Sequence, residues 1–176
     1  RETMSGVWWA AADPDVKDVG DAAKGYNGLA LQHGAEPNAA VVKETLDKLR
    51  EAGLISFGVE EQYGGFELPA FVANVILQMV ARADAGLMTI LGLQAGVAED
   101  IQRYGSEEMK RAYLPRFASG EVMGAMDLTE PQAGSDLGAI QTRATTENGK
   151  TFIDGNKIFI TNGGCEVQLG LARDAE

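Results

Sequence analysis

Residues 126–139 read MDLTEPQAGSDLGA and lie at the point where the sequence pattern changes from helical to β-rich. The stretch mixes acids, glycines, a proline and hydroxyl side chains, which neither a helix nor a uniform strand favours. Its glycines free the backbone and its proline removes one donor, so N–H groups and hydroxyls can turn to one side. Such a surface suits a phosphate or a flat, acceptor-rich ring, and an ordinary turn-rich loop is the alternative.

Upstream of this stretch the pattern is helical. Asn38 is a plausible N-cap for a first helix that ends near Gly53, and Pro69 can open the second. The third is apolar around most of its first half and should lie centrally among the helices. Ser106 caps the fourth, which declines at Pro115 and Gly120. The expected helices cover about residues 38–53, 69–84, 87–104 and 106–120.

Downstream of residue 120 the apolar period falls from 3.6 to 2, which marks a β region. The pairs Asn148-Gly149 and Asp154-Gly155 are typical of hairpin turns. The expected strand runs are 140–145, 151–153, 157–161 and 167–171. The fold class is therefore α+β. An extension of little periodicity (1–37) precedes an all-α domain (38–120) and the truncated start of an antiparallel β-barrel or sandwich domain (121–176).

Composition and motif counts exclude several classes of protein. Fifteen basic against 26 acidic residues argue against nucleic acid or an anionic membrane as the main partner. His33 and Cys165 are the only residues of their types, so no Cys/His metal cage and no internal disulfide can form. His33 is interpreted as a structural or surface residue and Cys165 as a small buried thiol.

Neither a dinucleotide-type GxGxxG loop nor a GxxxxGK[ST] loop occurs. No run is long enough to span a bilayer, and no signal peptide is recognised, so a cytoplasmic location is the default. Glu130 and Asp136 could form a carboxylate pair for acid–base work, but a carboxylate in such a loop more often ties down backbone.

Four segments in order resemble the acyl-CoA dehydrogenase family. LTEPQAGSDLG at 128–138 is similar to the family signature T-E-x-x-A/G-G-S-D, and KIFITNGG at 157–164 is similar to its flavin-contact strand K-x-W-I-T-N. YGSEEMKRAYLPRFASGE at 104–121 resembles the helix that leads into the family's β domain. GVEEQYGG at 58–65 matches an early loop.

The resemblance implies a helical domain, a middle β domain and a C-terminal helical domain that this chain does not contain. It implies FAD as cofactor, with Met126, Leu128 and Thr129 along the flavin ring. Gly134 and Ser135 would lie towards the ribityl–pyrophosphate side, with Ser135 also near the coenzyme A moiety of the substrate. Phe159, Ile160 and Thr161 would meet the other part of the ring. Phe159 stands where the family commonly has Trp, and Gln132 replaces a frequent Gly, as in the branch with methylthiopropionyl-CoA dehydrogenases.

The implied reaction converts an acyl-CoA to a trans-2-enoyl-CoA with hydride transfer to flavin N5, and electrons leave through an electron-transfer flavoprotein. A homo-oligomer, either dimer or tetramer, is implied. The family's catalytic base lies beyond this chain, so no catalytic residue is assigned and the chain alone is expected to be inactive. The alternatives are an acyl-CoA oxidase or flavin monooxygenase of the same fold, or a non-catalytic truncated or assembly subunit. The incomplete β domain is expected to expose strand edges and apolar surface.

Overall fold

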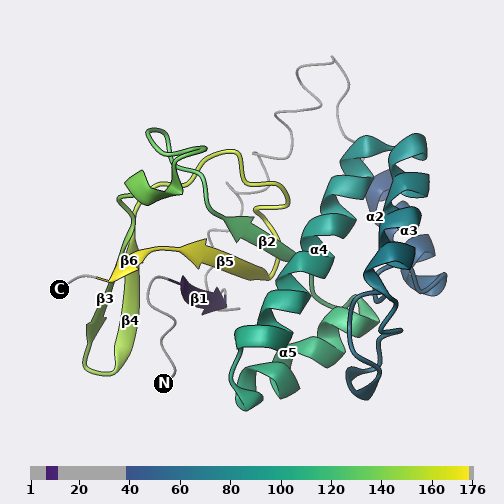
Figure 1. Cartoon of the computed structure of the whole chain (residues 1–176), viewed down its shortest axis with the longest axis horizontal. Coiled ribbons are helices and arrows are strands. Elements are labelled where there is room, and N and C mark those ends of the chain that lie inside the picture. The colour runs from purple at the N-terminus through teal and green to yellow at the C-terminus, as the bar shows by residue number, and fades with distance from the viewer. Residues whose placement is uncertain (1–6, 12–38, 175–176) are drawn as a thin grey trace.

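The computed structural model describes the backbone of residues 7–11 and 39–174, and side chains from residue 44 to residue 174. Helices occupy one side of the molecule and two small sheets the other (Figure 1). His33 and the predicted N-cap Asn38 lie outside the described residues. The helices are α2 (Ala39–Glu51), α3 (Ala70–Ala83), α4 (Ala85–Tyr104) and α5 (Glu107–Ser119), with 3₁₀ turns η2 (Glu61–Tyr63) and η3 (Leu137–Ala139).

The predicted helix ends follow from local capping. Gly53 has φ of 73°, and the N–H groups of Gly53 and Leu54 donate to the carbonyls of Arg50 and Leu49. This pair of bonds is a Schellman ending, which satisfies carbonyls that the last turn of α2 leaves free. At the start of α5 the Ser106 side chain accepts from the N–H of Met109. These two capping predictions are confirmed.

Helix α4 is the central helix, as its apolar composition predicted. Six of its residues are buried, and Val97 and Ile101 belong to a core cluster that also includes Phe117 of α5 and Leu169 of the main sheet. Burying such side chains stabilises the fold by about 1.5–3 kcal/mol each. One hydrophobic core therefore joins the helical part to the β region. The helix α5 continues past Pro115 and ends at Gly120, whose φ is 68°.

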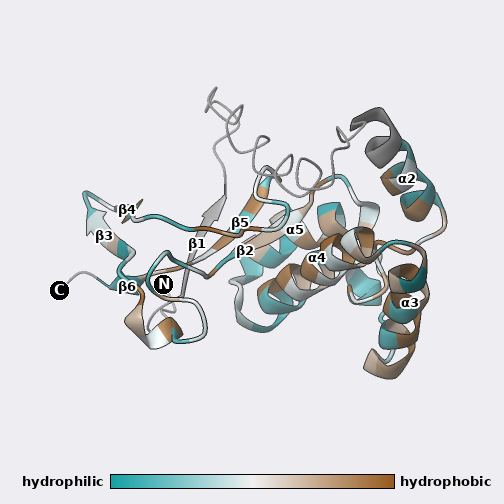
Figure 2. Cartoon of the chain, turned by 90° about the horizontal axis from the view of Figure 1, so that it is seen from above, coloured by the Kyte–Doolittle hydropathy of each residue, from teal (hydrophilic) through white to brown (hydrophobic). Residues whose placement is uncertain are grey.

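Helix α3 is formed as predicted, but its apolar stripe is not covered by the residues that the structure describes. None of its side chains is buried, and Phe71 and Met79 are 80% and 68% exposed. Hydrophobic residues recur along this helix at the outer side of the helical part (Figure 2). This exposed apolar surface lies on a helix, whereas the sequence led us to expect one on the incomplete β domain.

The β region contains two three-stranded sheets. The first has the order β1-β5-β2 and the second β4-β3-β6, each with one antiparallel and one parallel ladder. In the main sheet, β5 lies between antiparallel β1 and parallel β2. The strands are β1 (Val7–Ala11), β2 (Gly124–Asp127), β3 (Arg143–Glu147), β4 (Lys150–Asp154), β5 (Val167–Leu171) and β6 (Arg173–Asp174).

Three of the predicted strand runs form strands and one does not. The turn at Asn148-Gly149 is confirmed, with φ of 51° and 78° joining β3 to β4. The prediction of a second hairpin at Asp154-Gly155 is wrong, because the chain leaves the sheet there and residues 157–161 form no strand. At this point Gly155 packs against Thr142, since a Cβ on Gly155 would lie 2.2 Å from Thr142 Oγ1. Phe159 also has φ of 58°, which is incompatible with a strand.

The strands β1 and β2 were not foreseen from the sequence. The first lies in the segment 1–37 that was interpreted as an extension, and pairs with β5 from Val7 to Ala11. The second opens the irregular stretch that starts at Met126. Both are short and lack the alternation of apolar and polar residues that marks a half-buried strand. They form through backbone pairing with β5, which has one of them along each edge.

Two negative observations apply to the described part of the chain. No helix there is long and apolar enough to cross a membrane. No group of three or more His, Cys, Asp or Glu side chains is placed to hold a metal ion among the same residues. The division of the chain into domains at residues 37 and 120 stays a prediction.

Candidate functional site

The carboxylate of Glu130 is the anchor of the candidate site. Its side chain is only 3% exposed and accepts four hydrogen bonds. One oxygen accepts from the backbone N–H of Thr142 (3.0 Å) and from Lys157 Nζ (2.8 Å). The other accepts from Gln132 Nε2 and the N–H of Gln141, each at 2.6 Å. The interpretation that this carboxylate ties down backbone is therefore confirmed.

These bonds set the protonation state of Glu130. Burial alone would raise its pKa, but the hydrogen bonds from Lys157 and from the backbone of Gln141 and Thr142 outweigh burial. The net effect holds the pKa of Glu130 well below its usual range. A carboxylate with both oxygens engaged and a depressed pKa is a poor general base, so Glu130 has a structural role.

Lys157 joins the two segments that were predicted to contact a cofactor. Besides Glu130, its ammonium donates to the backbone carbonyl of Leu128 at 3.0 Å. One residue further, the N–H of Ile158 donates to the carbonyl of Thr129 at 2.9 Å. The segment that begins at Lys157 therefore runs beside the residues that follow β2, although they are separated by about thirty positions in the sequence.

The structure brings most of the eight predicted cofactor residues into one neighbourhood. Leu128 and Thr129 lie beside the segment that carries Phe159, and the Thr129 methyl lies 4.0 Å from where a Cβ on Gly134 would be. Met126 lies in β2 with its side chain packed on the core, and its Cε is 3.0 Å from a Cβ built on Gly96. Met126 could therefore contact a cofactor through its backbone groups and not through its side chain. The eight residues are Met126, Leu128, Thr129, Gly134, Ser135, Phe159, Ile160 and Thr161.

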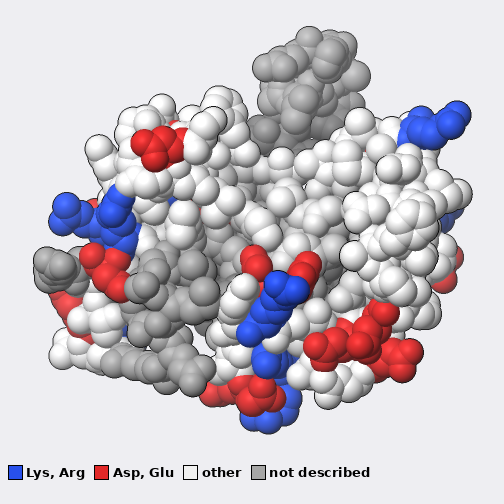
Figure 3. Space-filling model, in the orientation of Figure 1, with Lys and Arg blue, Asp and Glu red and all other residues white. Residues whose placement is uncertain are grey.

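Polar groups in this neighbourhood are free to meet a ligand. Within residues 44–174 no hydrogen bond engages the hydroxyls of Thr129, Ser135 or Thr161. The strand β2 lies at the edge of its sheet, and its second edge has no partner strand among the described residues. At the start of this free edge, the Gly124 carbonyl accepts a hydrogen bond from Asn162 at 3.5 Å. In Figure 3 a small acidic patch lies over the loops that follow β2, and the rest of the surface between these loops and the helices is largely free of charged side chains. Free hydroxyls and backbone beside a mostly neutral surface fit a flat ring with hydrogen-bond acceptors.

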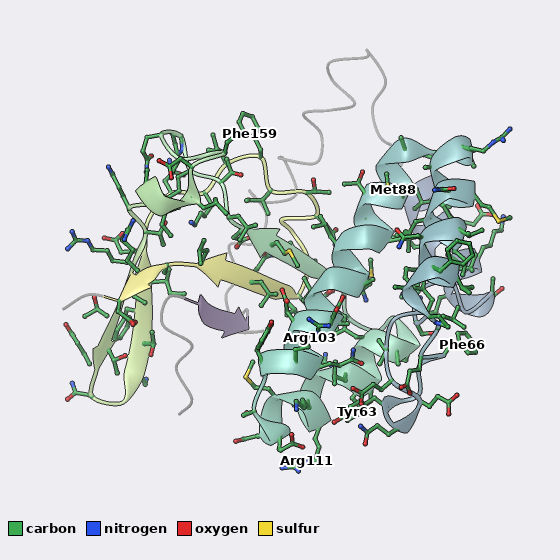
Figure 4. The ribbon with its side chains drawn as sticks, viewed as in Figure 1. Tyr63, Phe66, Met88, Arg103, Arg111 and Phe159 are labelled. Carbon is green, nitrogen blue, oxygen red and sulfur yellow. The ribbon has the colours of Figure 1, made fainter. Side chains whose placement is uncertain are left out.

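Phe159 is the most unusual residue of the site. Its ring is 87% exposed, and Figure 4 shows it on the outer side of the loops above β2. Its φ of 58° lies in the left-handed region, which costs a bulky residue about 1–2 kcal/mol. Strain of this kind and an uncovered aromatic ring both point to a residue retained for contact with a ligand.

Asp127, the last residue of β2, is a polar group that the sequence analysis did not single out. Its Oδ1 is buried and has no hydrogen-bond partner in the described part of the chain. Burial raises the pKa of Asp127 from 3.8 to about 6, although the nearby positive charge of Lys157 acts in the opposite direction. The sequence feature that could have pointed to Asp127 is its position as a single acid after the apolar residues of β2.

The Asp127 shift predicts a measurable pH dependence of stability. Between pH 4 and pH 6 the folded protein holds a proton on Asp127 that the unfolded chain has lost, so this contribution to stability declines as pH rises. Replacing Asp127 with asparagine should raise the free energy of unfolding at pH 7.5 by about 1 kcal/mol after solvent screening. The gain should vanish at pH 4, as measured by denaturant titration of both proteins. An equal gain at both pH values would contradict the assignment.

Cys165 is a buried free cysteine, as expected from the sequence. Burial raises the pKa of its thiol to about 12, and the nearby carboxylates of Glu166 and Asp127 act in the same direction. Because the thiolate is the reactive form, Cys165 is unsuited to nucleophilic work at neutral pH.

A hollow of about 700 Å³ lies beside the Glu130 loop. It is lined by that loop and by residues such as Thr142, Gly155 and Arg173, and by none of the eight predicted cofactor residues. Its charged lining residues are Arg143, Arg173, Asp154 and Glu130, of which Glu130 is already paired with Lys157. The hollow is therefore not the candidate site.

Comparison with known proteins supplies the family. The model of the acyl-CoA dehydrogenase N-terminal domain matches residues 29–121, and that of the acyl-CoA dehydrogenase middle domain matches residues 125–176. The chain belongs to the acyl-CoA dehydrogenase family. The specific branch within the family stays a prediction.

Individual relatives agree with this assignment. An acyl-CoA dehydrogenase of Bacillus subtilis is 38% identical over 136 residues, which are 73% of this chain and 36% of that protein. A glutaryl-CoA dehydrogenase from Mycobacterium smegmatis in complex with FADH2 matches 90% of this chain and 43% of its own, with a TM-score of 0.71 and 26% identity. An electron transferring flavoprotein structure from Acidaminococcus fermentans contains a chain that matches 86% of this one and 42% of its own, with a TM-score of 0.66 and 30% identity.

The chain spans about a third of the length of the curated relatives it matches. The helical part and the first strands of the β region are thus the part of the family fold that this chain contains. The α+β fold class expected from the sequence is confirmed.

Proposed function

We propose that this chain is part of an FAD-dependent acyl-CoA dehydrogenase, which oxidises an acyl-CoA thioester to a trans-2-enoyl-CoA. One observation carries the proposal: two distant segments with free hydroxyls and an exposed aromatic ring are held side by side by Lys157 and Glu130. The likeness to a relative whose structure contains FADH2 supports the choice of cofactor.

When bound, FAD would accept the hydride from the substrate at its flavin N5. The residues of this chain would bind and orient the cofactor. Leu128 and Thr129 offer backbone groups and a free hydroxyl to the ring, and Phe159 covers it from the second segment. Gly134 and Ser135 lie further along the loop, where the glycine gives close backbone approach to the ribityl–pyrophosphate part. Ser135 is also proposed to meet the coenzyme A moiety.

The chain's own acids do not supply the base that the reaction needs. Glu130 has both oxygens engaged in hydrogen bonds, and its pKa is depressed. We therefore place the catalytic base in a part of the protein outside this chain, and expect residues 1–176 alone to bind cofactor weakly and to be inactive. An electron-transfer flavoprotein is the proposed acceptor, and a homo-oligomer that covers the apolar face of α3 is the proposed assembly.

The proposal is tested with purified full-length protein. We expect a yellow protein that binds FAD stoichiometrically and reduces a dye acceptor when an acyl-CoA is added. Hydrogen peroxide formed in step with acyl-CoA consumption would instead identify an oxidase. Full-length protein that neither retains FAD nor responds to it would contradict the proposal.

Replacing Phe159 with glycine should have opposite effects on stability and on cofactor binding. Glycine relieves the left-handed strain, so the free energy of unfolding without FAD should rise by about 1 kcal/mol. Loss of the aromatic contact should weaken FAD binding by about tenfold, since aromatic contacts contribute roughly 0.5–1.5 kcal/mol beyond burial. Thermal unfolding and fluorescence titration with FAD check the two effects. The matched control is Phe152→Gly in β4, where no positive φ exists and stability should fall.

A further inference from the structure

Asp127 is the last residue of β2 and directly precedes the proposed cofactor residues Leu128 and Thr129. In β2, Gly124 and Met126 face α4, where a Cβ on Gly124 would lie 2.8 Å from Val97. Because side chains alternate along a strand, Asp127 points to the opposite face. The segment from Lys157 to Cys165 runs along the free edge of β2, where Asn162 donates to the Gly124 carbonyl and Lys157 to the Leu128 carbonyl.

The surroundings of Asp127 hold few charges. Among the described residues, the charged or titratable groups acting on it are Lys157 and the Cys165 thiol, while its partner across the parallel ladder is Gly170. The Lys157 ammonium already donates to Glu130 and to the Leu128 carbonyl. No donor therefore reaches Asp127 Oδ1, which stays buried and unpaired.

We propose that Asp127 is a redox-linked proton site, which takes up a proton from solvent when the bound flavin accepts electrons. The inference rests on the proposed function. It adds no covalent step: two electrons and one proton reach the cofactor as hydride from the substrate, and a separate solvent proton adds to the Asp127 carboxylate.

The physical reason is electrostatic coupling. Asp127 is joined by a peptide bond to Leu128, so its charge lies close to the proposed ring position in a partly buried environment, where Coulomb interactions exceed those in water. An ionised carboxylate there opposes the addition of negative charge to the ring. By thermodynamic linkage, protonation of Asp127 favours reduction of the flavin by the same factor by which reduction of the flavin favours protonation of Asp127.

The group is poised for this role at physiological pH. Its pKa of about 6 leaves Asp127 mostly ionised at pH 7.5 in the oxidised protein. Added negative charge on the cofactor would raise that pKa towards neutrality. The midpoint potential should consequently depend on pH more steeply between about pH 6 and pH 7.5 than flavin chemistry alone requires.

The test is spectroelectrochemical titration of the FAD-loaded full-length protein from pH 5 to pH 8.5. We expect Asp127→Asn to shift the midpoint potential upwards at pH 7.5, with at least a threefold change in the ratio of oxidised to reduced flavin at fixed potential. At pH 5 the two proteins should coincide. The control Asp136→Asn changes an exposed carboxylate of the same loop and should leave the potential unchanged.

The outcomes separate the two proposals. Normal FAD binding with parallel pH profiles for wild type and Asp127→Asn would overturn the inference and leave the proposed function standing. Failure of the wild type to bind FAD would overturn both. If Asp127→Asn does not fold, the wild-type profile decides alone, because the absence of a steeper region above pH 6 would overturn the inference.

Discussion

Full-length protein with Lys157 replaced by methionine is expected to lose about 3 kcal/mol of stability, because the Glu130 carboxylate then stays buried without its counter-ion. Glu130 is 3% exposed and its partner side chain is only 13% exposed, so water cannot replace the lost ammonium without structural change. Surface ion pairs in this protein, such as Lys48–Glu44, are mostly exposed and should contribute far less.

Loss of Lys157 should also separate the two cofactor segments. The ammonium is the direct link between the Leu128 carbonyl and the Glu130 carboxylate, so its removal leaves the Ile158–Thr129 hydrogen bond to hold the register. We expect FAD affinity to fall by at least about tenfold, which corresponds to 1.4 kcal/mol. Chemical denaturation and FAD titration measure the two effects.

The control for this variant is Lys150→Met, which removes an exposed charge at the start of β4. It should change neither stability nor FAD content by more than a small amount. Wild-type stability in Lys157→Met would show that the pair does not hold the site. The folded-state pKa of Glu130 lies below the unfolded pKa of about 4.3, so the pair should contribute its full stability at neutral pH. This contribution should be lost only in strong acid, as the pH falls through the depressed folded-state pKa.

Replacing Gln94 with leucine is expected to lower the free energy of unfolding by about 3 kcal/mol, because two buried backbone groups lose their partners. Gln94 in α4 is 1% exposed. Its amide donates to the Val122 carbonyl at 3.0 Å and accepts from the Gly124 N–H at 2.9 Å. These bonds fix the start of β2 against the helix, so the change should also displace the residues that follow β2.

A matched control is available on the neighbouring helix. Gln78 is an exposed residue of α3, and Gln78→Leu makes the same chemical change without unsatisfied partners. Denaturant titration of both variants should show a loss for Gln94→Leu alone. An equal loss in both would mean that helix propensity or solubility, and not the buried amide, sets the effect.

Helix positions could be predicted from the sequence because their signals are local. Gly53 ends α2 and Ser106 starts α5 through bonds within a few residues, so composition and spacing were sufficient. The hairpin at Asn148-Gly149 followed from turn chemistry for the same reason. The strands β1 and β2 could not be found in this way, because their pairing with β5 is a contact between distant segments.

In the candidate site, too, local features could be predicted from the sequence and contacts between distant segments could not. The sequence by itself determined the family through four quoted segments in order, and it determined that residues 126–139 are an irregular segment rich in hydroxyls, glycines and acids. Only the tertiary structure decided that Lys157 joins Glu130 to Leu128, that Phe159 is strained and exposed, and that Asp127 is buried without a partner. Burial and pairing arise when segments far apart in sequence meet, so no local pattern contains them.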